Sequence, residues 1–299
     1  MNRRSASKSL LGAALGPLLR ADDSTQIEVG GGVIDVTIAG AGFDLSQAAL
    51  LAWVKGAADA VTWYFGRYPV PHARVQIRPG RRDGVSNGVT FGEGGARTRI
   101  AVGLHSTAAD LKDDWIMTHE MVHYGFPSVE DNHHWIEEGS AVYIEPVARV
   151  HVGQLTPERI WGDMVRDMPQ GLPEAGDQGL DNTHTWGRTY WGGAIFCLLA
   201  DIGIRKRTGN AKSLQDALRA INSAGGTIEA DWPLQRAIQI GNKETGSTTL
   251  TELYEQMGSK PVTVDLPALW RQLGVRSSDH GVTFDSQAPL AAIRASILS

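Results

Sequence analysis

The sequence of 299 residues contains a single cysteine, Cys197, which excludes an intramolecular disulfide. Cys197 stands in the apolar segment 194–199 with no Cys or His neighbour, so we expect a small buried hydrophobic residue rather than a nucleophile or a metal ligand. Long hydrophobic runs are also missing. No stretch reaches the roughly 18 apolar residues of a membrane-spanning helix, and we therefore expect no integral membrane span.

Charge of either sign is modest. The net charge of −5 gives no reason to expect nucleic acid or an anionic membrane as a partner. The 13 Pro and 35 Gly are spread along the chain, and we find neither a low-complexity linker nor an internal repeat. With 42% hydrophobic and 20% charged residues, the composition is that of an ordinary globular protein. Nothing in it specifies an oligomeric state.

The first 21 residues allow two interpretations. Arg3, Arg4 and Lys8 precede a short apolar stretch, Leu10–Leu19, and a poor cleavage site follows. This arrangement resembles a weak signal peptide, and the arginine pair is similar to a twin-arginine export signal. The alternative is a frayed N-terminal helix. We expect a soluble protein that is exported in the first case and cytoplasmic in the second.

Hydrophobic periodicity separates a strand-rich first third from a helical remainder, which predicts an α+β fold. We expect a mixed sheet and helix part over 22–125, ending in a helix with the chemical motif, and a mainly helical part over 126–299. Predicted strands lie at 27–29, 33–38, 75–77, 89–91 and 99–102, and predicted helices at 45–65, 111–124, 135–149, 157–168, 188–205, 213–221, 249–257 and 266–273.

The chemical motif is His119-Glu120-Met121-Val122-His123, the H-E-x-x-H pattern of zinc hydrolases. Positions i and i+4 share one face of a helix, so His119 and His123 can point two imidazoles at one ion. Glu120 lies about 100° further round the helix and can reach a metal-activated water without being a ligand. The alternative is a surface helix with two unrelated histidines.

A catalytic zinc usually has three protein ligands and one open position. Metzincins place a third histidine six residues after the motif, but Val129 occupies that position and excludes this class. His133 and His134 lie further on in a polar segment and share no helical face with the first pair. We interpret them as surface or substrate-side residues.

Two adjacent glutamates are better candidates for the third ligand. Glu137 and Glu138 lie on the second predicted helix, where neighbours point about 100° apart, so only one should face the site. Gly139 permits close approach of the first helix, which favours Glu138. Glu145 lies two turns further along the same face and could accept a hydrogen bond from the outer N–H of a ligand histidine. Its alternative is an ordinary carboxylate.

These residues bear a family resemblance. His119-Glu120-x-x-His123 followed by Trp135-x-x-Glu138-Gly139-x-Ala141-x-Tyr143-x-Glu145 resembles the gluzincins of the thermolysin-like peptidase clan, most of all the aminopeptidase N, leukotriene hydrolase and glycyl aminopeptidase branch. The resemblance covers roughly residues 60–210. It implies a thermolysin-like zincin fold, one zinc ion (Zn2+) per chain and Glu138 as third ligand. The family's transition-state tyrosine opens a helix in a Tyr-x-x-Gly-Ala pattern, which matches Tyr190-Trp191-Gly192-Gly193-Ala194.

The chain departs from this family at two points. The spacer between His123 and Glu138, residues 124–137, is shorter than the family's usual spacer. The Gly-x-Met-Glu-Asn exopeptidase motif is missing, and the glycine-rich stretch 88–94 in its place has Glu93 as its one carboxylate. The pattern therefore gives no support for recognition of free N-termini.

The resemblance implies a zinc-dependent peptidase that acts on a peptide or protein substrate, with Glu120 as general base and the Tyr190 hydroxyl stabilising the oxyanion. One alternative is a zinc hydrolase of a non-peptide amide or an epoxide. Another is a non-catalytic, metal-stabilised binding protein. We interpret the nearby His184 and Arg188 as ordinary loop charges, and Trp186 and Trp191 as core residues.

Overall fold

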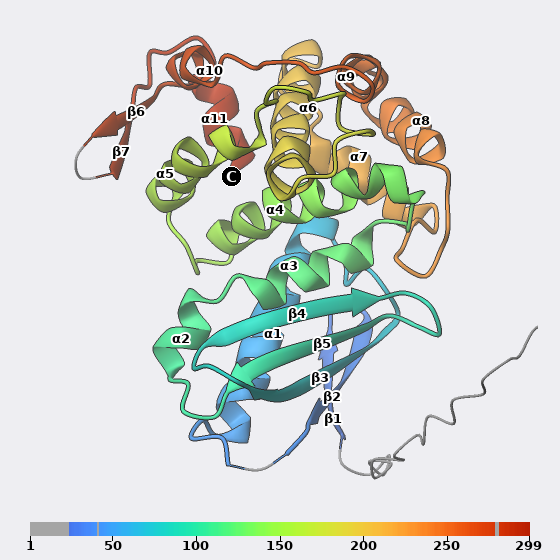
Figure 1. Ribbon diagram of the computed structural model, residues 1–299, viewed down its shortest axis with the longest axis vertical. Helices are drawn as coiled ribbons and strands as arrows, with labels where there is room; N and C mark the ends of the chain where they lie inside the picture. The colour runs from blue at the N-terminus through green and yellow to red at the C-terminus, as the bar shows by residue number, and fades with distance from the viewer. Residues whose placement is uncertain (1–23, 41, 279–280) are drawn as a thin grey trace, which may run out of the picture.

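The structure is a computed structural model that describes residues 24–40, 42–278 and 281–299 (Figure 1). The segment 1–21, with its predicted signal or frayed helix, lies outside the described residues. The strands are β1 (Ser24–Val29), β2 (Gly32–Ile38), β3 (His72–Gly80), β4 (Val85–Phe91), β5 (Arg97–Gly103), β6 (Val275–Ser278) and β7 (Gly281–Phe284). The helices are α1 (Gln47–Phe65), α2 (Ala108–Asp113), α3 (Ile116–Val122), α4 (His134–His151), α5 (Pro157–Asp167), α6 (Gly193–Arg207), α7 (Leu214–Ser223), α8 (Leu234–Thr245), α9 (Thr249–Met257), α10 (Leu266–Leu273) and α11 (Ala291–Ile297).

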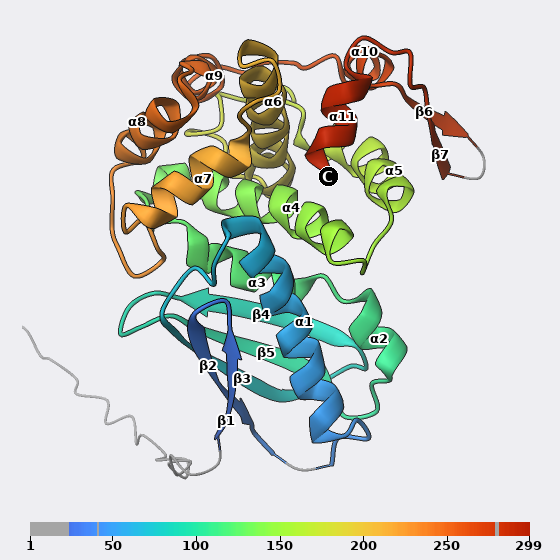
Figure 2. The same ribbon diagram turned by 180° about the vertical axis from the view of Figure 1, so that it is seen from behind.

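The predicted α+β architecture is confirmed. A five-stranded sheet has the order β1-β2-β3-β5-β4, with parallel β2–β3 and β3–β5 pairs and antiparallel pairs at both edges. Helix α1 covers one face of this sheet (Figure 2), and helices α4 to α11 form the other half of the molecule (Figure 1). None of the described helices is long and apolar enough to cross a membrane. Strand β4 lies at the sheet edge, next to α3.

Strand alternation and capping explain the first half. On β3 and β5 the inward residues Val75, Ile77 and Ile100 are buried, while their neighbours face outward. The predicted helix 45–65 is confirmed as α1. Its cap is Ser46, whose hydroxyl accepts the Ala49 N–H, and it ends at Gly66 with a φ of 77°.

The single helix predicted over 111–124 is wrong. The chain instead forms α2, an extended residue at Asp114, α3, and a 3₁₀ turn over His123–Gly125. Asp114 causes the restart, because its carboxylate accepts the N–H groups of Ile116 (2.9 Å) and Met117 (3.1 Å) and satisfies the first turn of α3. Residue 123 keeps helical dihedral angles, so the i, i+4 geometry of the two histidines survives.

Glycine controls the contact between α4 and α6. A Cβ on Gly139 would lie 2.3 Å from the Gly193 backbone, and a Cβ on Gly193 would lie 2.1 Å from the Trp135 carbonyl oxygen. We expected Gly139 to admit the helix of the H-E-x-x-H motif. The structure corrects this expectation, since the helix that approaches Gly139 is α6.

We therefore expect Gly193→Ala to lower the free energy of unfolding by about 3 kcal/mol, because two rigid backbones must separate to admit one methyl group. Chemical denaturation measures this change. The control is Gly162→Ala in α5, where a Cβ would meet only a Val282 methyl group at 3.9 Å. Equal stabilities of the two variants would contradict the close-contact interpretation.

Candidate metal centre

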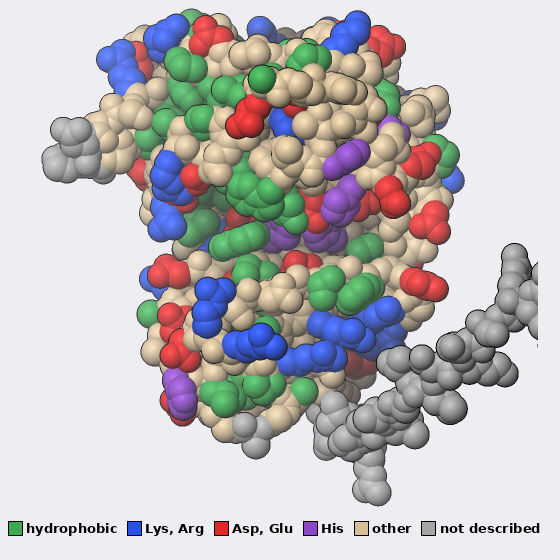
Figure 3. Space-filling view, viewed as in Figure 1, with side chains coloured by type: hydrophobic (Ala, Val, Ile, Leu, Met, Phe, Trp, Pro, Cys, Tyr) green, Lys and Arg blue, Asp and Glu red, His purple; other side chains and the backbone are tan. Residues whose placement is uncertain are grey.

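A cleft of about 610 Å³ separates the sheet half from the helical half. Figure 3 shows it as a hollow across this face, with histidine and carboxylate side chains inside. Its lining comes from the edge strand β4, from α3, from the start of α4 and from the segment before α6. The floor is therefore built by the segments that contain the H-E-x-x-H motif and its predicted partners.

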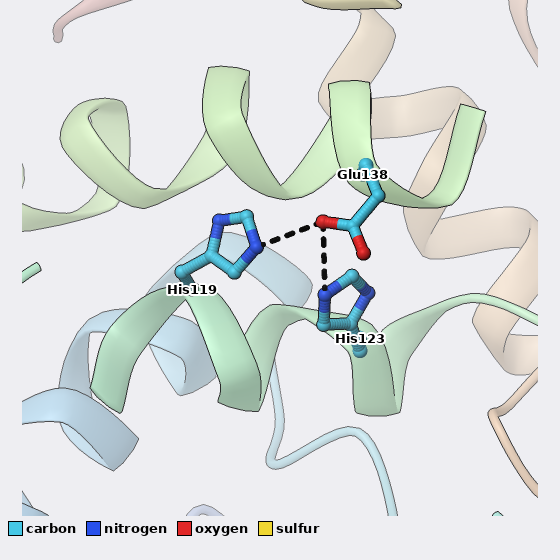
Figure 4. Close-up of side chains that lie close together, drawn as sticks. All are labelled: His119, His123 and Glu138. Atoms are coloured by element: carbon cyan, nitrogen blue, oxygen red, sulfur yellow. Dashed lines mark hydrogen bonds and ion pairs between the residues drawn. The ribbon is translucent and has the colours of Figure 1, made fainter. Parts of the chain in front are cut away.

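Three of the predicted residues meet in this cleft. Figure 4 shows His119 and His123 pointing up from α3 and its C-terminal end, and Glu138 pointing down from α4. The Glu138 Oε2 atom lies 3.1 Å from His119 Nε2 and 3.7 Å from His123 Nε2. One ligand atom of each residue lies within 4.8 Å of the other two.

This geometry fits a metal ion. Tetrahedral ligands about 2.0–2.1 Å from zinc are about 3.4 Å apart, close to the two observed separations. Two imidazoles and a carboxylate are also a donor set of catalytic zinc sites. Glu137 lies outside the cluster, because its carboxylate accepts the Val129 N–H (2.8 Å) and contacts His134 Nδ1 (3.0 Å).

Protonation states in the cluster suit metal binding. Burial, with the neighbouring His119, lowers the pKa of His123 to about 4, so its imidazole is neutral at pH 7. Burial alone would raise the pKa of Glu138, but hydrogen bonds with His119 and His134 hold it well below its usual range. Metal ligands must be deprotonated, and both groups already are.

His134 contacts both glutamates at the start of α4. Its Nδ1 lies 3.0 Å from Glu137 and its Nε2 lies 3.2 Å from Glu138 Oε1, the carboxylate oxygen that does not face the histidine pair. These two hydrogen bonds raise the pKa of His134 to about 10. His134 therefore holds Glu138 in the orientation that turns Oε2 toward His119 and His123.

Glu120 is buried at the cleft floor and does not belong to the ligand cluster. Burial raises the pKa of its carboxyl, and a hydrogen bond from Thr90 opposes that effect. The Thr90 hydroxyl lies 2.7 Å from Glu120 Oε2 and 2.8 Å from the Thr98 hydroxyl, which in turn lies 2.6 Å from the Tyr124 hydroxyl. This chain of three hydroxyl groups, which sequence reasoning missed, fixes the carboxylate.

Strand β4 approaches Glu120 through its backbone. A Cβ at Gly88 would lie 2.6 Å from Glu120 Cγ, so any side chain there would displace the carboxylate. Thr90, two residues on, faces the same side. The signal in the sequence was the alternation of small inward residues, Ser86, Gly88 and Thr90, along one strand.

Tyr190 lies in a π-helical turn, Arg188–Gly192, that leads directly into α6. Such turns occur mostly as short insertions within helices, frequently at functional sites. The Tyr190 ring lies parallel to that of His119, with centroids 6.3 Å apart. Burial, and then the charges on Glu138 and Glu120, raise the pKa of Tyr190 to about 12. Its hydroxyl therefore stays protonated and can donate a hydrogen bond into the cleft.

The hydrogen bond predicted between Glu145 and a ligand histidine is not made. Glu145 Oε1 accepts from Arg149 Nη1 at 2.6 Å, one turn further along α4. His119 Nδ1 is buried without a hydrogen-bond partner among the described residues. The cause is Arg149, whose buried guanidinium needs a counter-charge and takes this carboxylate.

Three neighbouring residues also differ from their predictions. Arg188 is not a loop charge, since it is buried and forms an ion pair of 2.7 Å with Asp177. His133 is not a surface residue, because it is buried with its Nδ1 2.9 Å from Asp181. Trp186 is 57% exposed and stacks on Tyr190 rather than packing in the core, whereas Trp191 packs on the core as predicted.

Several solved structures have a fold similar to that of this chain. The chain matches an aminopeptidase N family protein from Idiomarina loihiensis with a TM-score of 0.63 and 14% identity, over 89% of this chain and 52% of that chain. It matches an M1 zinc metallopeptidase from Deinococcus radiodurans with a TM-score of 0.52 and 16% identity, over 82% of this chain and 52% of that one. A variant of the latter bound to a Tyr-Ser-Ala substrate matches with a TM-score of 0.52 and 16% identity, over 82% of this chain and 53% of that chain.

These matches show that the chain has the fold of M1 zinc metallopeptidase catalytic domains, in agreement with the aminopeptidase N resemblance noted in the sequence. The chain spans about half the length of the solved structures it matches. No protein-family model and no curated protein matches the sequence.

Proposed function

We propose that this protein is a zinc-dependent peptidase that hydrolyses internal peptide bonds. One observation carries the proposal: a buried carboxylate, Glu120, faces the cleft beside a His119–His123–Glu138 cluster without belonging to it. A purely structural metal site has no use for such a carboxylate. A hydrolase needs it as a proton acceptor.

Each side chain at the site has a distinct role in the proposed hydrolysis. A bound zinc ion supplies Lewis acidity, which lowers the pKa of water and polarises a carbonyl group. Glu120 accepts the proton of the attacking water and delivers it to the leaving amine, while Thr90 holds its carboxylate in place. The Tyr190 hydroxyl donates a hydrogen bond to the developing oxyanion.

The cleft suits an extended polypeptide. Among the strands that the structure describes, β4 pairs with β5 alone, so its other edge offers backbone groups to which a substrate can add as a further strand. The large hydrophobic residues that are exposed in the described part of the chain, Val89, Trp115 and Trp186, all line this cleft. Trp115 and Trp186 also line an adjoining cavity of about 450 Å³ beside α4 and α5, which could receive an apolar side chain.

Among the described residues, the cleft lining includes no carboxylate suited to a substrate's free amino group. Its acidic lining residues are Glu120, Glu137 and Glu138, and each already has polar partners. Glu120 contacts Thr90, and Glu137 contacts the Val129 N–H and His134. Glu138 contacts the histidine pair. This observation supports cleavage within a chain rather than removal of N-terminal residues.

The test combines metal analysis with a substrate panel. We expect about one zinc per chain, and cleavage of N-terminally blocked peptides that stops with a chelator and resumes with zinc. Small amides, esters and epoxides form the second arm of the panel. Turnover of these alone would favour the non-peptide hydrolase, and zinc binding without any turnover would favour the binding protein.

A further inference from the structure

The outer face of the sheet concentrates positive charge. Strand alternation turns Arg74 and Arg78 of β3 and Arg97 and Arg99 of β5 to the same side, and the β3–β4 connection adds two more arginines, Arg81 and Arg82. We call these six residues the arginine face. Figure 3 shows a band of basic side chains across the sheet half of the molecule, although the whole protein has a net charge of −5.

Most of these charges lack a counter-charge within the described fold; Arg74 lies opposite Asp35 of β2, which itself pairs with His72. In the part of the chain that the structure describes, none of the six forms an ion pair with a carboxylate. Arg159, Arg207 and Arg276 of the other half each pair with an Asp or Glu. Arg74 and Arg97 donate to the backbone carbonyls of Gly94 and Glu93.

The register places like charges side by side. Arg74 lies directly opposite Arg97 across the β3–β5 pair. Like charges on neighbouring strands repel one another, and Asp35, which lies opposite Arg74 on its other side, is already hydrogen-bonded to His72. A ligand with negative charge would remove the repulsion.

The arginine face adjoins the cleft through β4. The outward residues Val89 and Phe91 lie opposite Arg99 and Arg97, whose guanidinium groups lie over the Phe91 ring at 5.4 and 4.9 Å. A substrate strand added to the free edge of β4 would turn every second side chain to this outer face. Strand β5 would lie two strand spacings, about 10 Å, from this substrate strand, a separation that the long side chains of Arg97 and Arg99 and an acidic side chain can span together.

We propose that the arginine face binds the acidic side chains of a polypeptide that enters the cleft along β4. The proposal rests on the proposed function and adds the substrate class, a chain with Asp or Glu at alternate positions beside the cleaved bond. Nucleic acid fits less well. Binding of single strands uses aromatic rings interleaved with the basic residues, whereas Phe91, the aromatic residue among these arginines, is covered by Arg97 and Arg99, and the exposed Trp115 and Trp186 lie in the cleft instead.

Equilibrium binding tests the proposal without requiring hydrolysis. The probe is a fluorescent decapeptide with Glu at alternate positions, compared by anisotropy with the same peptide containing Gln. The protein is the full chain with Glu120→Gln, which leaves the peptide uncut. We expect the Glu peptide to bind at least about tenfold more tightly at low salt and to lose this advantage as salt rises.

The test variant is Arg81→Gln/Arg82→Gln/Arg99→Gln, which removes three charges that make no hydrogen bond or ion pair among the described residues. The control is Lys206→Gln/Lys260→Gln/Arg271→Gln, with the same change of net charge at exposed positions of the helical half. We expect about tenfold weaker binding of the Glu peptide by the test variant alone.

Equal loss in both triple variants, or equal binding of the Glu and Gln peptides, would overturn the proposal. Tighter binding of a single-stranded oligonucleotide of matched charge would also overturn it and point to nucleic acid. A protein that binds the Glu peptide but hydrolyses nothing would refute the peptidase function and leave the arginine face standing.

Discussion

We expect Glu120→Gln to abolish the proposed peptide hydrolysis while the protein still binds zinc and folds. We expect kcat/KM to fall by about 10³-fold or more, because the amide cannot accept the proton of the attacking water. Gln nearly matches Glu in shape, and its carbonyl oxygen can keep the hydrogen bond from Thr90. The measurements are initial rates on a blocked peptide, with zinc content and thermal midpoint determined on the same samples.

The combination of results is what assigns the role. Lost activity with zinc retained identifies a group that acts on the reacting atoms. Lost activity together with lost zinc would mean that residue 120 supports the metal site instead. Hydrolysis at the parental rate would remove Glu120 from the mechanism.

We expect Glu138→Gln to weaken zinc binding by at least about 100-fold, a larger effect than the 10- to 100-fold typical of residues behind the ligands. The reason is loss of the one carboxylate of the cluster, which leaves the two imidazoles of His119 and His123 as ligands. Competition with a chromophoric chelator measures the affinity directly, without reference to turnover.

The adjacent glutamate provides the matched control. Glu137→Gln removes the same charge one residue earlier on α4, at a side chain that contacts Val129 and His134 rather than the cluster. We expect its zinc affinity to stay within about tenfold of the parent. Loss of zinc in Glu137→Gln but not in Glu138→Gln would exchange their roles.

Local sequence patterns predicted much of the fold and the core of the site. The i, i+4 spacing of His119 and His123 needs only one helical turn, so it survives although the helix around it is shorter than predicted. The same holds for α1, where the N-cap, the apolar face and the terminal glycine are all local signals. Helix α8 and the β6–β7 hairpin were missed.

The remaining differences arise from contacts between distant segments. Whether Arg188 meets Asp177, or Glu145 meets Arg149 instead of His119, depends on burial that no window of sequence reports. Thr90 on β4 contacts Glu120 on α3, although the two residues are far apart in the sequence. Gly139 contacts α6 rather than α3, and this depends on how the helices pack in the folded protein. The resemblance found Tyr190, since spacing alone could not bring that residue to the histidines.

Strand β4 has a practical consequence for redesign. Its inward positions, Gly88 and Thr90, lie against Glu120, the proposed proton acceptor, whereas Asn87, Val89 and Phe91 face away from it. A combinatorial library restricted to the outward set would sample different preferences for the bound chain while the reactive geometry stays constant. Positions expected to control the rate and positions expected to control selectivity therefore alternate along this one strand.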